Sequence, residues 1–274
     1  MDKIKKIAIH GVPRSGTTWI GEIINSSKNV KYAFQPLFSY KYKNYLTKCS
    51  NRYEINNFFE LLKNELEDSF ILQKDKRENG LLPKFIKSEI THVVYKEVRY
   101  HNILFNLARN SPDLKFVFII RSPFAVINSW LKAPREFRKD LNWSIYEEWR
   151  YALKKNLNKV EEFNGFEKWK EATNIFLEIK KQFPDRVYII EYNKFLENTL
   201  KYTTELFSFC ELKLESQTMD FISKRSRREE KDAYSVYRIK NNDDKWKYEL
   251  DNKIVKEIKS DLFGTSLKKY MYLS

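Results

Sequence analysis

The chain contains little of several residue types that define whole classes of protein. Its 274 residues include only 2 cysteines, Cys49 and Cys210, which are too few for a disulfide framework or a zinc-ligand set. With 6 glycines and 7 prolines, it has no collagen-like or low-complexity segment. It also lacks an apolar run long enough to cross a membrane and, at its start, the apolar core of a signal peptide. We therefore expect a cytoplasmic protein without a transmembrane segment.

The remaining composition is that of a folded and strongly basic protein. Hydrophobic residues make up 42% of the chain, which is ordinary for a globular protein. Because 274 residues fit one large domain and no linker rich in proline, glycine or serine divides them, residues 1–274 are expected to form a single domain. The net charge is +14, and most of the excess is attributed to solvated, lysine-rich faces. Nucleic-acid binding is not expected, because the densest basic run, KRSRREEK at residues 224–231, is interrupted by two glutamates. Part of the excess is expected to surround an anionic ligand in a cleft.

The strongest local pattern is the stretch HGVPRSGTTWIGEII at residues 10–24. An apolar run at residues 4–9 predicts a buried strand before it. Apolar residues at helical spacing behind it predict a helix that begins near Ser15. A strand, a small-residue loop and a helix in this order direct backbone N–H groups and a helix N-terminus toward an anion. The stretch therefore predicts a phosphate-binding loop; the alternative is a structural turn that binds nothing.

The loop differs from that of nucleoside-triphosphate enzymes in one residue. The glycine spacing from Gly11 to Thr18 fits the pattern G-x-x-x-x-G-K-[ST], but Thr17 stands where the lysine belongs. That lysine reaches the β and γ phosphates, so its absence argues against ordinary ATP chemistry. Gly16 still allows close approach of the backbone, and the Arg14 guanidinium and two threonine hydroxyls add donors.

These residues resemble a known family. The segment PRSGTTW is similar to the 5′-phosphosulfate loop of sulfotransferases, which use 3′-phosphoadenosine 5′-phosphosulfate (PAPS). A second stretch, LKFVFIIRSPFAVINSW at residues 114–130, resembles the family's 3′-phosphate site, with an arginine at a strand end and a serine eight residues later. VYIIEYNKFLENT resembles a segment near the adenine, and YSVYRIKNNDDKWKYEL resembles a late loop that closes on the cofactor. The resemblance implies these cofactor-binding residues: Pro13, Arg14, Ser15, Gly16, Thr17, Thr18, Trp19, Arg121, Ser129, Tyr192 and Arg238.

The order of expected elements indicates the fold class. Strands are expected at residues 4–9, 30–34, 92–98, 116–120 and 187–191, with helical patterns between them. This is an α/β protein with a P-loop-like, three-layer fold, in which helices flank a central, mostly parallel sheet. Residues 56–72 place Phe58, Leu61, Leu62, Leu66 and Phe70 on one face of an expected helix.

Catalysis of sulfuryl transfer requires cations at the transferred group and a base at the acceptor hydroxyl. The resemblance implies that Arg14 and the loop hold the leaving phosphate and that Lys96 stabilises charge, and no metal is expected to be required. Gln35 occupies the place of the glutamate base of tyrosylprotein and Golgi carbohydrate relatives, and Val98 that of the histidine base of cytosolic relatives. Glu97 is therefore the preferred base, with His101 second.

The sequence does not specify the acceptor. Segments outside the matching stretches, residues 37–90 and 131–170, are expected to shape its pocket, and the tryptophans in or beside the second segment either stack on sugars or belong to the core: Trp130, Trp143, Trp149 and Trp169. A carbohydrate or glycolipid hydroxyl is the favoured acceptor, ahead of a small phenol or alcohol or a peptide tyrosine. Two other functions stay open: a kinase-like P-loop phosphotransferase using ATP, and a non-catalytic binder of phosphoadenosine or nucleic acid.

Overall fold

The computed structural model describes residues 4–224 and 243–271, and its centre is a parallel β-sheet. Five strands pair in the order β2-β3-β1-β4-β5, and every pairing is parallel. The strands are β1 (Lys5–His10), β2 (Val30–Phe34), β3 (His92–Glu97), β4 (Leu114–Ile120) and β5 (Val187–Glu191). They confirm the five strands expected from the apolar runs, with ends that differ by at most two residues.

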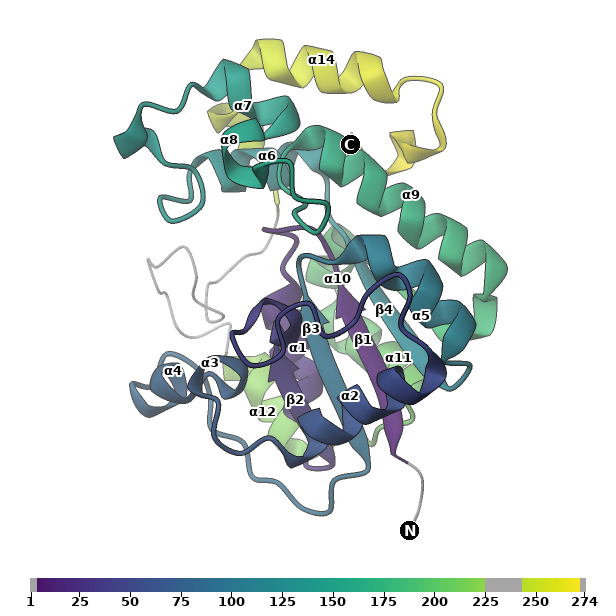
Figure 1. The fold of residues 1–274 in the computed structure, drawn as a ribbon. Helices are drawn as coiled ribbons and strands as arrows, with labels where there is room; N and C mark the ends of the chain where they lie inside the picture. Colours follow the sequence, from purple (N-terminus) through teal and green to yellow (C-terminus); the bar gives the residue numbers. More distant parts are fainter. Residues whose placement is uncertain (1–3, 225–242, 272–274) are drawn as a thin grey trace.

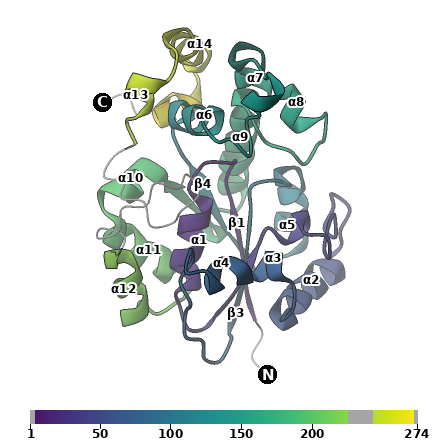
Figure 2. The same cartoon turned by 90° about the vertical axis from the view of Figure 1, so that its left-hand side faces the viewer.

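Helices cover both faces of the sheet, which confirms the expected α/β class (Figure 2). Side chains alternate along a strand, so Ile7 and Ile9 of β1 pack on one face while Ala8 packs on the other. The first face is covered by α1 (Thr17–Asn25), α10 (Tyr192–Glu197), α11 (Thr199–Cys210) and α12 (Ser216–Lys224). The second face is covered by α2 (Arg52–Asn64), α5 (Leu104–Asn110) and α9 (Phe166–Gln182).

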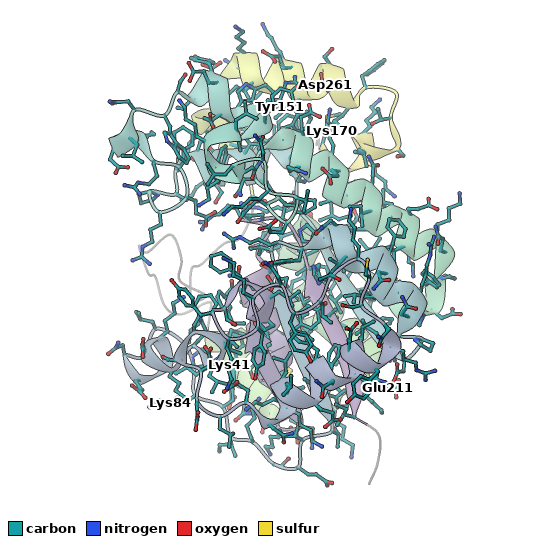
Figure 3. The ribbon with its side chains drawn as sticks, in the orientation of Figure 1. Lys41, Lys84, Tyr151, Lys170, Glu211 and Asp261 are labelled. Carbon is teal, nitrogen blue, oxygen red and sulfur yellow. The ribbon has the colours of Figure 1, made fainter. Side chains whose placement is uncertain are left out.

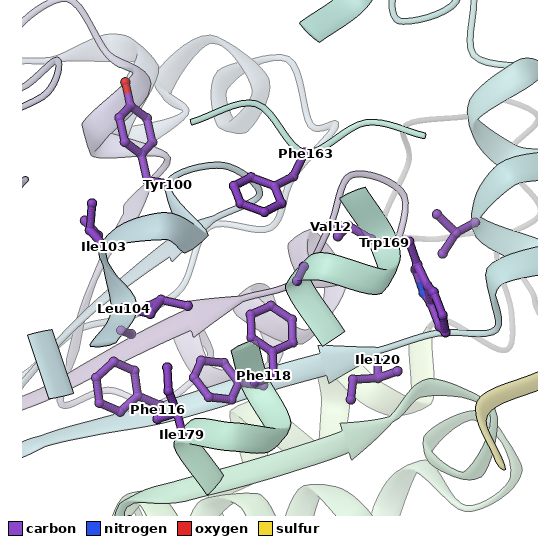
Figure 4. Packing of buried hydrophobic residues seen from close by; sticks show 14 of the residues in the cluster. Val12, Tyr100, Ile103, Leu104, Phe116, Phe118, Ile120, Phe163, Trp169 and Ile179 are labelled. Carbon is purple, nitrogen blue, oxygen red and sulfur yellow. The ribbon is translucent and has the colours of Figure 1, made fainter. Parts of the chain in front are cut away.

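Aromatic residues fill the layer between the sheet and α9. Phe116 and Phe118 of β4 lie beside Ile179 of α9 (Figure 4), and all three side chains are buried. The rings of Phe118 and Phe176 stack with centroids 4.4 Å apart. Burial of each such side chain contributes about 1.5–3 kcal/mol, so this layer anchors α9 firmly to the central strands.

A further group of helices lies beyond the end toward which the strands point (Figure 1). It comprises α6 (Pro123–Leu131), α7 (Ile145–Tyr151), α8 (Leu153–Asn156), α13 (Trp246–Glu249, labelled in Figure 2) and α14 (Asn252–Leu262). Arg150 of α7 links this group, because its guanidinium bonds Glu167 of α9 at 2.9 Å and Asp261 of α14 at 2.5 Å. Lys170 of α9 reaches the same Asp261 at 3.3 Å (Figure 3).

The helix expected over residues 56–72 is interrupted, which corrects the sequence prediction. Helix α2 ends at Asn64, and α3 (Ser69–Leu72) begins after a turn. Glu65 is buried in this turn and accepts hydrogen bonds from the Tyr42 hydroxyl and from backbone N–H groups of the turn. Leu66 is consequently 71% exposed, although its spacing assigned it to the buried stripe.

The remaining elements are short: η1 (Pro36–Phe38), α4 (Lys74–Glu78), η2 (His101–Ile103), η3 (Lys139–Leu141), η4 (Pro184–Arg186) and η6 (Ser266–Met271). In the described part of the chain, no helix combines the length and the apolar character needed to cross a membrane.

Candidate functional site

The loop between β1 and α1 has the backbone geometry of an anion-binding turn. Arg14 and Gly16 both adopt left-handed conformations, with φ of 72° and 86°. Gly16 is the N-cap of α1, which begins at Thr17, two residues later than expected. Gly11 is required where the loop leaves β1, because a Cβ there would lie 2.8 Å from the Ile119 carbonyl oxygen of β4.

Several donors in this loop have no protein partner. Within residues 4–224 and 243–271, nothing accepts a hydrogen bond from the backbone N–H groups of Gly16, Thr17 or Thr18. The Ser15 hydroxyl is buried and is also without a partner among these residues. Buried polar groups are normally paired, and the N-terminus of a nine-residue helix attracts negative charge. The loop therefore fits a phosphate or sulfate group.

Arg121 lies directly beside this loop, at the end of β4. Its guanidinium donates to the backbone carbonyl of Arg14 and forms a bidentate ion pair with Asp243, with both N–O distances at 2.6 Å. Ser129 of α6 accepts a hydrogen bond from Arg14 Nε at 3.1 Å. The fold thus brings together the two stretches that the sequence singled out, although they are separated by more than 100 residues.

Tyr192 closes the side of the loop that faces β5. A Cβ on Gly16 would lie 2.2 Å from Cε2 of its ring, and the Arg121 guanidinium carbon lies 5.3 Å from the ring centroid. Trp19 meets the same ring edge-on, with centroids 6.2 Å apart. Arg238, the remaining predicted cofactor residue, lies outside the described residues.

Lys96 lies at the end of β3 on the side of the sheet that carries α1. Its ammonium is 4.2 Å from the Phe34 ring centroid, and the residue is 1% exposed. Among the described residues, no hydrogen-bond acceptor or carboxylate contacts this ammonium. Burial lowers the pKa of Lys96, and the charge of Glu97 acts in the opposite direction.

Glu97 points to the opposite face of the sheet from Lys96. Strand β3 continues through Glu97, so the two neighbouring side chains alternate. Glu97 is fully buried, its Oε1 accepts the Leu37 N–H at 2.8 Å, and no described residue bonds its Oε2. Burial raises the pKa of Glu97, and the charge of Lys96 opposes this change.

His101 is buried in the core on the same side as α9. Its Nδ1 lies 3.0 Å from Nδ1 of His10, and Nε2 of His10 lies 3.1 Å from the Tyr95 hydroxyl. Burial holds the pKa of His101 well below its usual range, so the ring is neutral. The Phe163 ring packs against the His101 ring with centroids 4.4 Å apart, a contact typical of the hydrophobic core.

The tryptophans belong mainly to the core. Trp130, Trp149 and Trp169 are each less than 5% exposed, so they offer no face to an acceptor. Trp143 is partly buried and packs edge-on against Phe137. Their helical spacing reflects packing, which was the alternative that the sequence left open.

Two acidic residues at the site were missed by sequence reasoning. Asp243 pairs with Arg121, as described above, and Glu136 lies 3.6 Å from the Arg14 guanidinium. Asp243 lies in the stretch that resembles the family's late loop, but it was not singled out there, and Glu136 belongs to no recognised motif. The fold brings each to the loop from more than 100 residues away. The described residues contain no group of three or more histidine, cysteine or acidic side chains suited to a metal ion.

Comparisons with known proteins agree with this geometry. A family model described as "Sulfotransferase family" matches residues 6–216. The mouse sulfotransferase SULT7A1, solved with PAP, superposes with a TM-score of 0.52 at 13% identity, covering 98% of this chain and 89% of that one. The sulfotransferase domain from the curacin biosynthetic pathway gives a TM-score of 0.51 at 17% identity, covering 96% and 99%.

No curated protein sequence matches the chain. The two superpositions concern the fold, whereas the family model spans more than three quarters of the residues and includes both loops that form the site. The chain therefore belongs to the sulfotransferase family.

Proposed function

We propose that the protein transfers a sulfuryl group from PAPS to an acceptor hydroxyl. The observation that carries this proposal is the position of Arg121 beside the loop of Arg14, since the 3′- and 5′-phosphates of PAPS lie on the same ribose. The unpaired N–H groups of Gly16, Thr17 and Thr18 would hold the 5′-phosphosulfate. Arg121 and Ser129 would bind the 3′-phosphate, and Tyr192 would lie near the adenine.

Binding of the 3′-phosphate requires a change of partner at Arg121. In this structure both of its outer nitrogens are occupied, by Asp243 and by the Arg14 carbonyl. A phosphate dianion is a stronger acceptor than a single carboxylate, so exchange of Asp243 for phosphate is chemically reasonable. Arg14 would likewise leave Ser129 to reach the phosphosulfate.

The cationic side chains supply the charge stabilisation that sulfuryl transfer needs. Arg14 carries a permanent charge, and Lys96 adds a second cation from the adjacent strand. Because Arg14 and Lys96 would supply this charge, we propose that turnover requires no divalent metal. The bases predicted from sequence, Glu97 and His101, are both fully buried in this structure.

For the acceptor we propose a carbohydrate or glycolipid hydroxyl. The buried tryptophans no longer support this choice, but two exposed rings do. Phe38 and Phe70 are 42% and 40% exposed, with centroids 6.1 Å apart, and Phe70 packs edge-on against Phe34, the ring that Lys96 contacts. Aromatic rings next to the predicted catalytic cation provide a surface on which a sugar can stack.

Ligand-induced stabilisation tests the nucleotide assignment. Thermal unfolding is measured with 3′-phosphoadenosine 5′-phosphate (PAP) in chelator, with ATP and magnesium, and with a DNA oligonucleotide. We expect stabilisation by PAP without metal. A stronger effect of ATP with magnesium would favour a P-loop phosphotransferase, and a stronger effect of the oligonucleotide would favour a nucleic-acid binder.

Activity is then measured as transfer of radiolabelled sulfate from PAPS to a panel of oligosaccharides, glycolipids, phenols and a tyrosine peptide. Binding of PAP without transfer to any acceptor, water included, would identify a catalytically silent binder and overturn the proposed activity.

A further inference from the structure

Carboxylates near the loop and Lys96 in the described part of the chain include Asp243, Glu97, Glu162 and Glu136. Asp243 pairs with Arg121, Glu97 accepts from the Leu37 N–H, and Glu162 accepts from Arg99 at 2.8 Å. Glu136 is the fourth. A general base must reach the acceptor hydroxyl next to the transferred group. Glu97 is fully buried and points to the face of the sheet opposite Lys96, and Asp243 lies at Arg121, the predicted 3′-phosphate site, so neither is well placed for this role.

Glu136 has free oxygens and access to solvent. Its side chain is 24% exposed, and no described residue donates a hydrogen bond to it. Its contact with the Arg14 guanidinium, at 3.6 Å, is longer than a hydrogen bond. Both carboxylate oxygens can therefore accept an O–H from a bound acceptor.

Glu136 is held on a well-anchored turn. Its N–H donates to the Ala133 carbonyl at 2.9 Å, and the N–H of Phe137 donates to the same oxygen at 2.8 Å. Phe137 is buried against Trp130, with ring centroids 5.3 Å apart. Because this turn follows α6, the helix that carries Ser129, the carboxylate has a fixed position relative to the predicted 3′-phosphate site.

Cations from three elements surround this carboxylate. Arg14 contacts it directly from the loop. Burial lowers the pKa of both Lys96 of β3 and Lys155 of α8, and the charge of Glu136 acts against that change in each case. Arg138 follows on the same turn, and its guanidinium is paired with Asp140. The carboxylate thus lies among the groups expected to contact the sulfuryl oxygens.

We propose that Glu136 is the catalytic base of sulfuryl transfer. This inference rests on the proposed function. The acceptor oxygen forms a bond to sulfur as the bond between sulfur and the bridging oxygen of the 5′-phosphate breaks. The hydroxyl proton passes to the Glu136 carboxylate, and PAP leaves with the electron pair of the broken bond, next to Arg14.

The test compares Glu136→Gln with the wild-type protein for three acceptors of radiolabelled sulfate from PAPS. Water and methyl galactoside are very weak acids, so their reaction requires a general base. By contrast, 4-nitrophenol ionises readily near neutral pH and requires little general-base catalysis. We expect Glu136→Gln to lose roughly 10²–10⁴-fold in kcat with methyl galactoside and water and to retain transfer to 4-nitrophenol. Its affinity for PAP should not fall, because a competitor for Arg14 has been removed.

Four further variants make the result specific. Asp140→Asn removes a carboxylate from the neighbouring segment, where it pairs with Arg138, and should leave all rates unchanged. Glu136→Asp, which keeps a carboxylate, should retain part of the activity that Glu136→Gln loses. Glu97→Gln should retain turnover, and His101→Ala should affect stability more than rate.

Two outcomes would overturn the proposal. If Glu136→Gln binds PAP more tightly but transfers sulfate to methyl galactoside at the wild-type rate, Glu136 only competes with the cofactor for Arg14. A loss confined to Glu97→Gln would return the role to Glu97. Failure of the wild-type protein to release sulfate to any acceptor is a different result, because it removes the proposed function itself together with its base.

Discussion

Replacement of Gly16 by alanine tests how closely the loop and Tyr192 are packed. At this position a Cβ would meet the Tyr192 ring at 2.2 Å, and the backbone has a φ of 86°. The left-handed conformation costs an alanine about 1–2 kcal/mol. Relief of the overlap costs about 1–3 kcal/mol more, because Tyr192 is buried and packed against Trp19.

Gly80 provides a matched control for the conformational part of this cost. It has a φ of 71°, and a Cβ there would meet nothing within 4 Å. Gly80→Ala should therefore lose only the conformational component. At about 2–4 °C per kcal/mol, the melting temperature of Gly16→Ala should fall several degrees below that of Gly80→Ala.

Differential scanning calorimetry measures these shifts, and isothermal titration with PAP measures binding. Gly16→Ala should also weaken PAP binding, because any shift of the loop moves the N–H groups of Thr17 and Thr18, whereas Gly80→Ala should bind PAP normally. Equal melting temperatures and equal PAP affinities for the two variants would refute the argument that Tyr192 fixes the loop.

Three other predictions concern the charges of the site. Arg121→Ala is made together with Asp243→Asn so that no buried carboxylate is left unpaired. In a titration, the double variant should bind PAP more weakly by about 1.5–3 kcal/mol, and its affinity for adenosine 5′-phosphate should fall much less. Equal losses for the two ligands would place the 3′-phosphate elsewhere. Burial lowers the pKa of Lys96, so its ammonium is present at low pH and is lost as the pH rises. The value of kcat/KM should therefore fall at a pH below the ordinary lysine pKa of 10.5. A pH profile of Lys96→Met that keeps this fall would contradict the assignment. Sulfuryl transfer should continue in EDTA, and a loss that magnesium restores would show that a metal is needed.

The sheet and the loop were predictable from sequence because both rest on local patterns. A parallel strand buried on both faces needs a continuous apolar run, as β1 and β4 have. The phosphate loop depends on glycines at fixed spacing after such a strand. The break at Glu65 was not predictable, because the side chain that stabilises the turn bonds Tyr42, a partner outside the helix.

The acidic residues of the site illustrate a second limit. Asp243 and Glu136 act on Arg121 and Arg14 only through tertiary contacts, so the sequence did not indicate which basic residue each of them meets. The orientation of Glu97 depended on where β3 ends. If the strand had ended at Lys96, the Glu97 side chain would not have been required to point to the face opposite Lys96. Strand ends are among the least certain features of a sequence prediction, so this question required the structure.

The central claim is that the protein uses PAPS as a sulfuryl donor, and product analysis tests it most directly. Purified protein is incubated in chelator with PAPS carrying radiolabelled sulfate and with the acceptor panel, and PAP and labelled acceptor are quantified together. We predict that they appear in equal amounts and that both are lost in a variant carrying Arg14→Ala. Consumption of ATP with magnesium and no release of PAP from PAPS would contradict the assignment.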